Sequence, residues 1–149
     1  MSYQEKSTIV SLVTTVLIFT GCSIYVFQKY QDGSLNETNV FSFYGAVFIF
    51  LIIVGIVNSI IRNTVLNIIA AKEREPSFID ERDKIIELKA TVIAHYVFIT
   101  GFGLSMGALV FDVAPLMMFP ILFSFGFAAS ILADISKIYL YRRGYSLSL

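Results

Sequence analysis

Charged side chains are scarce in this chain of 149 residues, and they are missing altogether from four long apolar segments. Charged residues make up 15% of the sequence, whereas about a quarter of a soluble domain is charged. Each segment has the ~20 residues that a helix needs to cross ~30 Å of hydrocarbon. The sequence therefore predicts a single all-α domain over residues 1–149, an integral membrane four-helix bundle. Its spans are about Thr8–Phe27, Phe41–Ile61, Ala90–Phe111 and Pro115–Ala133.

Cysteine and histidine each occur once, as Cys22 and His95. A single cysteine excludes an internal disulfide and a cysteine metal cluster, and a single histidine needs carboxylates at matching depth before it can hold a metal. The common catalytic motifs, such as H-E-x-x-H, G-x-S-x-G and the P-loop, are also missing. We therefore expect no catalytic residue, no metal and no cofactor. These absences favour a non-enzymatic protein, although an enzyme is not excluded.

Lysine and arginine are distributed unevenly among the predicted loops. The start of the first segment is weakly basic and lacks a clean cleavage site, so we expect it to remain as the first span. Four spans then place both termini and the central segment, residues 62–89, on one side of the membrane. Ten of the eleven Lys and Arg residues fall on that side, and Lys29 falls on the other. Because positive charge marks the cytoplasmic side, we predict a multi-pass protein of the cell inner membrane with both termini in the cytoplasm.

The central segment contains the sequence P-S-F-I-D-E-R-D-K-I-I-E-L-K-A at residues 76–90. Pro76 disfavours helix at the residue before it, and Asp80 can cap a new helix, with Asp83 at its third position. We expect this helix to run without a break into the third span. The second helix is expected to extend beyond the bilayer to about Lys72, so that helices two and three both project into the cytoplasm.

Charged residues around this helix start form a candidate site at the cytoplasmic rim of the membrane. Asp83 and Glu87 are like charges one turn apart, which is unfavourable on an isolated helix. We therefore expect a cationic partner for them, from Arg62, Arg82, Arg142 or Arg143. The alternative is a solvated helix start with no further role. The members of the rim site are Asp80, Glu81, Arg82, Asp83, Glu87 and Lys89.

The letters D-E-R-D-K-I-I-E-L-K-A at Asp80–Ala90, leading into a membrane span, resemble the entry to the third helix in a known family. That family is an uncharacterised group of small four-helix membrane proteins from bacteria and archaea. The resemblance covers the size and layout of the chain, and its specific part is this short segment. It implies a bacterial inner-membrane protein, and it supplies no functional residues to carry over.

Polar residues at membrane depth form a second candidate site, since such groups are costly in hydrocarbon. His95 lies six residues beyond Lys89, and Asn58 lies one turn before Arg62. Asp134 ends the fourth span from the same side. We predict that Asn58, Arg62, His95 and Asp134 form one polar layer in the cytoplasmic third of the bilayer.

The residues that share a helical face with this layer predict a pocket. At about 100° per residue, the face of Asn58 carries Leu51 and Gly55, and the face of Asp134 carries Phe127 and Ser130. The face of His95 carries Thr91 and Met106. We expect these faces to converge on a pocket with a polar base and an aromatic, methionine-lined upper part. The alternative is that Asn58, His95 and Asp134 are hydrogen-bonding groups that hold the helices together.

Pairs of small residues spaced four apart predict close helix contacts. They occur in spans two, three and four, and they suit packing within the bundle or between protomers. The pairs are Gly55 and Ser59, Gly103 and Gly107, and Gly126 and Ser130.

Three functions fit these features. The first is a small non-enzymatic membrane protein that binds a lipid, a peptide or a protein partner in regulation, stress response or self-protection. The second is a transporter or channel component that uses the Asn58, His95 and Asp134 layer. The third is a membrane enzyme acting on a lipid or quinone, with His95 as its base. The expected partners are membrane lipids and either a second copy of the chain or another membrane protein, with no nucleic acid.

Overall fold

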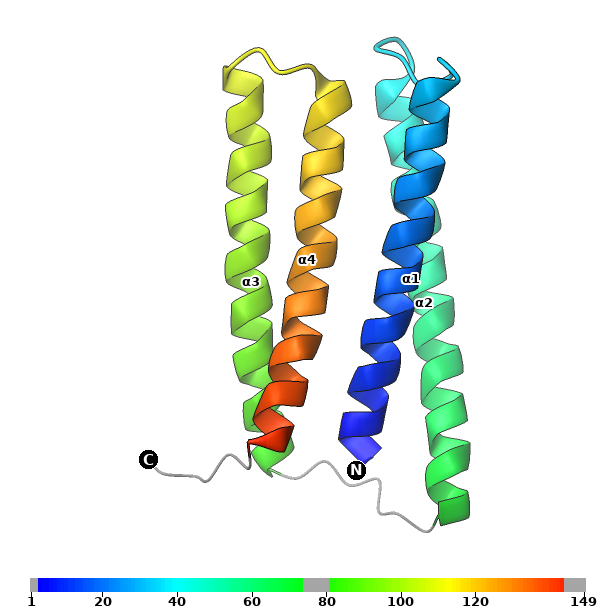
Figure 1. The fold of residues 1–149 in the computed structure, drawn as a ribbon, viewed down its shortest axis with the longest axis vertical. Coiled ribbons are helices and arrows are strands. Elements are labelled where there is room, and N and C mark those ends of the chain that lie inside the picture. Colours follow the sequence, from blue (N-terminus) through cyan, green and yellow to red (C-terminus); the bar gives the residue numbers. More distant parts are fainter. Residues whose placement is uncertain (1–2, 74–80, 144–149) are drawn as a thin grey trace.

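The computed structural model describes residues 3–73 and 81–143, and these residues form four long α-helices and no strands (Figure 1). All four helices are long enough and apolar enough to cross a membrane. The predicted all-α class and the four candidate spans are therefore confirmed. The helices are α1 (Tyr3–Gln31), α2 (Val40–Glu73), α3 (Glu81–Val110) and α4 (Pro115–Arg142).

The helix ends in the central segment agree with the sequence. Helix α2 continues beyond its apolar stretch to Glu73, one residue past the predicted Lys72. Helix α3 begins at Glu81 and runs unbroken to Val110. The proline break at Pro76 and the cap at Asp80 lie outside the described residues.

Two short connections join the helices at the end of the molecule away from the start of α1, which we call the loop end (Figure 1). Between α3 and α4, Asp112 has a left-handed backbone with φ of 57°, and the N–H of Val113 donates to the carbonyl of Ala108 at 3.1 Å. This satisfies a carbonyl of the last turn of α3, as helix C-terminal motifs commonly do. Pro115 then opens α4, where its missing N–H costs nothing. The start of α1 and the end of α4 meet at the other end, the terminal end.

Helix α4 holds the molecule together. It packs most closely against α3 and next most closely against α1, while α2 is held more loosely by α1 and α4. Figure 1 shows this order, with α3 beside α4, α4 beside α1, and α2 beside α1. The result is a pair of helical hairpins whose interior lies along α4 and α1.

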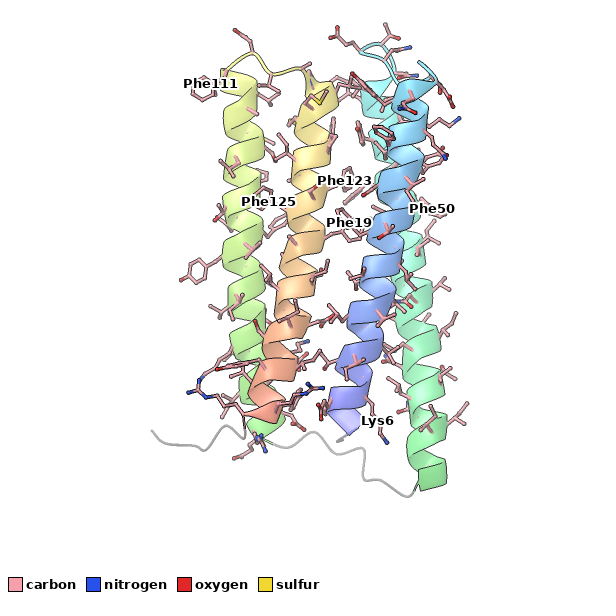
Figure 2. All side chains as sticks on the ribbon, in the orientation of Figure 1. Lys6, Phe19, Phe50, Phe111, Phe123 and Phe125 are labelled. Carbon is pink, nitrogen blue, oxygen red and sulfur yellow. The ribbon has the colours of Figure 1, made fainter. Side chains whose placement is uncertain are left out.

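The seam between α3 and α4 depends on small residues that differ from the predicted pairs. Gly101 lies against Phe125 so closely that a Cβ at Gly101 would overlap the phenylalanine, and Figure 2 shows Phe125 pointing toward α3. Ser105, one turn on, is fully buried and donates its hydroxyl to the Gly101 carbonyl at 2.8 Å.

The glycines of the predicted small-residue pairs make no close contact with the other helices in the described part of the chain. A Cβ added to Gly103 or Gly107 would meet nothing within 4 Å, and the same holds for Gly55 and Gly126. Gly101 and Gly103 are about 200° apart around the helix, and α3 turns Gly101 toward α4. Packing of the predicted pairs between protomers stays a prediction.

Candidate functional site

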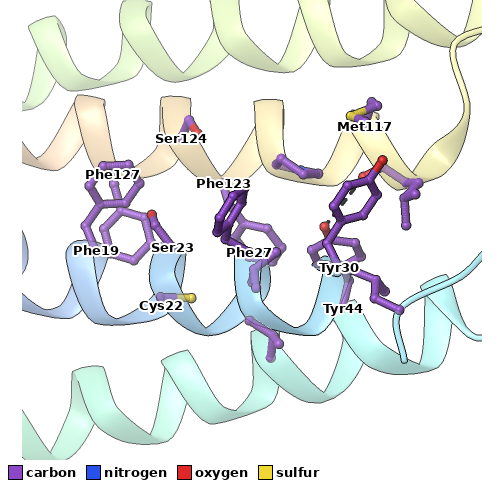
Figure 3. A pocket seen from close by; sticks show the side chains of 15 residues that line it. Phe19, Cys22, Ser23, Phe27, Tyr30, Tyr44, Met117, Phe123, Ser124 and Phe127 are labelled. Atoms are coloured by element: carbon purple, nitrogen blue, oxygen red, sulfur yellow. Dashed lines mark hydrogen bonds between the residues drawn. The ribbon is translucent and has the colours of Figure 1, made fainter. Parts of the chain in front are cut away.

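An apolar cavity of about 360 Å³ lies between α1, α2 and α4 in the half of the molecule nearest the loop end (Figure 3). We call it the aromatic cavity. Phe19 and Phe127 face each other at one end of it, with ring centroids 5.0 Å apart. Phe123 and Tyr44 line it closer to the loops, with centroids 5.9 Å apart. Aromatic pairs at these distances add directional stability to the packing of the cavity wall.

Tyr44 anchors the loop end of the aromatic cavity. Its side chain is 2% exposed, its ring stacks on Phe119 with centroids 4.8 Å apart, and its hydroxyl donates to the Leu116 carbonyl at 3.5 Å. A buried tyrosine needs such a partner for its hydroxyl. Tyr44 is therefore the contact that ties the start of α2 to the start of α4.

A second cavity, of about 430 Å³, lies nearer the terminal end and is lined by residues of all four helices. We call it the polar cavity. Asn58 and Arg62 reach it from α2, Thr91 from α3, and Asp134 and Lys137 from α4. Polar groups at this depth are costly unless they are paired or serve a site.

Asp134 is the most deeply buried charged residue of the polar cavity, with 7% of its surface exposed. Its carboxylate interacts with the Ser11 side chain and with the charges of Lys137 and Arg62. Asn58 donates a long hydrogen bond of 3.4 Å to the Thr14 hydroxyl. The polar side chains therefore connect α2 and α4 to α1.

The Arg62 side chain has an N–H group without a hydrogen-bond partner among the described residues. Its Nε atom is buried and has no hydrogen-bond partner in the described part of the chain. Buried donors in proteins are nearly always paired. The Nε of Arg82 is also buried and unpaired among the described residues, and of these two arginines it is Arg62 that lines the polar cavity.

The aromatic and polar cavities share a wall. Phe127 lines both of them, and on α4 the lining residues change from Lys137 and Asp134 through Phe127 to Phe123 and Met117. At a rise of ~1.5 Å per residue, Lys137 and Met117 are separated by about 30 Å along the helix, the thickness of the hydrocarbon core. The two cavities lie on either side of Phe127, the polar one toward the terminal end and the apolar one toward the loop end, and we call the pair the crevice.

A third cavity, of about 160 Å³, opens at the terminal end and is lined almost entirely by polar residues; we call it the rim cavity. Asp83 and Glu87 of α3 line it together with Arg62 and Lys137. Arg62 was among the cationic partners predicted for this acidic pair. Lys137 was not, although its position one turn after Asp134 could have indicated it.

The other predicted rim residues are spread over the surface of the terminal end. Arg82 donates to the Tyr141 carbonyl at 3.4 Å, whereas Glu81 and Lys89 have exposed side chains. Arg142 forms an ion pair of 3.1 Å with Glu5 of α1 and does not line the rim cavity.

His95 is not part of the polar cavity as the structure forms it. Its side chain is exposed, and its ring contacts the neighbouring Tyr96 with centroids 6.4 Å apart. Helix α3 instead turns Thr91 and Ala94 toward the cavity. The structure thus brings Asn58, Arg62 and Asp134 together and leaves His95 and Met106 on an exposed face.

Hydroxyl groups from α1 and α4 complete the lining of the site. Ser11 and Thr15 of α1 and Ser130 of α4 line the polar cavity, and Ser11 also lines the rim cavity. Ser11 and Thr15 are four residues apart and so share one face of α1, and Ser130 lies on the face predicted from Asp134. No group of three or more His, Cys, Asp or Glu residues in the described part of the chain could hold a metal ion.

Comparison of the chain with known protein families, with curated proteins and with solved structures gives no match. The fold and the site therefore define a class, a protein with four candidate membrane-spanning helices and an amphipathic crevice between them.

Proposed function

We propose that this chain is a small, non-enzymatic integral membrane protein that binds one amphipathic, lipid-like molecule in the crevice. The observation that carries the proposal is the shared wall at Phe127, where an apolar cavity meets a polar one. A ligand with a polar head and an apolar tail matches that arrangement. The two volumes, about 360 and 430 Å³, fall within the ~300–1,000 Å³ of ordinary ligand pockets.

The proposed orientation puts the polar end of the crevice toward the cytoplasm of an inner membrane. It rests on the uneven distribution of Lys and Arg. In a Cys22→Ser background, we expect a single cysteine from Glu37→Cys to react with a membrane-impermeant maleimide in intact cells. A single cysteine from Arg143→Cys is expected to react after the cells are opened. The reverse pattern would refute the orientation.

Native mass spectrometry after release from a mild detergent tests the proposed binding. We expect wild type to carry a copurified lipid-like mass. Ser23→Phe places a ring in the aromatic cavity and is expected to abolish that mass. Thr20→Phe is the matched control, because Thr20 is exposed on the same helix and its hydroxyl bonds to its own helix at Val16. Wild type without any bound mass, or Ser23→Phe with the same bound mass, would contradict the proposal.

A transporter or channel component is the second candidate. The supporting observation is that Ser11, Arg62, Asp134 and Lys137 line both the rim and the polar cavities, so polar surface extends inward from the terminal end. Ion flux into liposomes should then fall for Asp134→Asn. His95→Ala is the matched control, since His95 lies outside the polar cavity. Equal flux for Asp134→Asn and wild type would argue against this candidate.

A further inference from the structure

The charged residues of the polar cavity indicate what kind of head group the crevice would hold. Its lining contains Arg62, Lys137 and Asp134, two positive groups and one negative. Asp83 and Glu87 line the smaller rim cavity but not the polar cavity. The lining of the polar cavity itself therefore carries one more positive than negative charge, while Asp83 and Glu87 face Arg62 and Lys137 from the rim side.

Arg62 supplies an independent indication. Its buried Nε has no hydrogen-bond partner in the described residues, and its side chain lines the polar cavity. An arginine side chain only donates hydrogen bonds, so a ligand group that pairs with the Nε–H of Arg62 must be a hydrogen-bond acceptor. The planar guanidinium matches a carboxylate through two parallel N–H···O bonds.

We propose, on the basis of the proposed function, that the ligand of the crevice is a single-chain fatty acid whose carboxylate binds Arg62. Lys137 provides the second positive charge, and the acyl chain lies past Phe127 in the aromatic cavity. A single negative charge balances the excess positive charge of the polar cavity. Asp134 disfavours a head with more than one negative charge, because like charges at this depth repel strongly.

Competition among three matched amphiphiles tests the head group. A long-chain fatty acid, the alcohol of the same chain length and the primary amine of the same chain length are titrated into the full-length protein in a mild detergent. Bound mass is followed by native mass spectrometry. We expect the acid to bind at least about tenfold more tightly than the alcohol, because a carboxylate can form an ion pair with two parallel N–H···O bonds to Arg62, whereas a neutral hydroxyl cannot. The amine is expected to bind most weakly.

Substitutions of Arg62 test its role as the carboxylate ligand. Arg62→Gln should weaken binding of the acid by roughly 10- to 100-fold, the range expected for a lost hydrogen bond to a charged group, and should weaken binding of the alcohol by a smaller factor. Arg62→Lys should recover part of the affinity, because it keeps the charge but not the planar donors. Arg143→Gln is the control: Arg143 is exposed and donates to the Tyr139 hydroxyl of its own helix at 2.8 Å.

The outcomes separate this inference from the function on which it rests. If the acid and the alcohol bind equally, or if the amine binds most tightly, the head-group assignment is wrong and lipid binding stands. If Arg62→Gln leaves the affinity for the acid unchanged, Arg62 is not the ligand. If none of the three amphiphiles binds and wild type carries no lipid, the proposed function itself fails. The comparison of acid, alcohol and amine on wild type needs no variant to fold.

Discussion

Replacing Gly101 with alanine is expected to force α3 away from α4. A Cβ built at Gly101 would overlap the Cβ and Cγ of Phe125 and would lie 2.8 Å from its Cδ1. Carbon atoms pack best at about 3.5–4.0 Å, so even the most distant of these three atoms is too close by about 0.7 Å. The overlapping atoms include the Cβ of Phe125, which no rotation of its side chain can move. The helices must therefore separate, and overpacking of this kind costs about 1–3 kcal/mol.

Gly103→Ala provides the matched control on the same helix. Nothing lies within 4 Å of a Cβ at Gly103, so this variant reports the gain in helix propensity, at most about 1 kcal/mol, without the steric overlap. We expect Gly101→Ala to unfold at lower denaturant than Gly103→Ala. For both variants, unfolding is followed as the loss of the helical circular dichroism signal while dodecyl sulfate is added to the micelles. Equal unfolding midpoints for the two variants would refute the close seam at Gly101.

Phe125→Ala tests which atoms of the seam matter. It removes the Cγ and Cδ1 of Phe125 but keeps the Cβ that overlaps most directly with the added group. The double variant with Gly101→Ala should therefore remain less stable than Phe125→Ala alone. Full recovery in the double variant would mean that the ring, and not the approach of the two backbones, limits residue 101.

Three further predictions concern contacts across the molecule, each measured by the same micelle titration. Tyr44→Ala should lower the free energy of unfolding by about 3–5 kcal/mol, because the side chain is 2% exposed. Tyr44→Phe should lower it by less than about 1 kcal/mol, because the lost hydrogen bond is 3.5 Å long. Equal losses for the two variants would show that the hydroxyl and not the ring matters. Thr14→Val should cost about 0.6 kcal/mol by removing the acceptor of the Asn58 amide, and no change would mean that Asn58 has another partner. Arg142→Gln should lower the free energy of unfolding by less than about 1 kcal/mol, because Arg142 pairs with Glu5 while its side chain is 65% exposed. A larger loss would show that the ion pair is shielded from water.

The helices and their ends could be predicted because they depend on local chemistry. A stretch of about 20 residues without charge forms a helix in hydrocarbon, since every backbone N–H and C=O must be paired within the segment. The extension of α2 to Glu73 and the unbroken α3 from Glu81 follow from local signals of the same kind. Asn58 and Asp134 line the polar cavity together with Gly55, Phe127 and Ser130, the neighbours that share their helical faces.

The choice of face on α3 could not be predicted. Its residues are apolar or small on every side, so periodicity does not distinguish the face that packs against α4 from the face that remains exposed. His95 was predicted to join the polar layer, and Gly103 to pack within the bundle or between protomers, whereas the helix turns Thr91, Ala94 and Gly101 toward its neighbours. In the observed rotation of α3 against α4, a Cβ at Gly101 would overlap Phe125, so this seam requires glycine at residue 101.

The amino-acid sequence by itself determined that this chain forms four membrane-length helices, because the absence of charge over each segment is a local property of the chain. The tertiary structure alone decided which side chains meet. It placed Arg62, Asp134 and Lys137 around one cavity and set an apolar cavity on the other side of Phe127. The rotation of each helix about its axis depends on the fit of side chains far apart in sequence, and a uniformly apolar helix carries no local record of that fit.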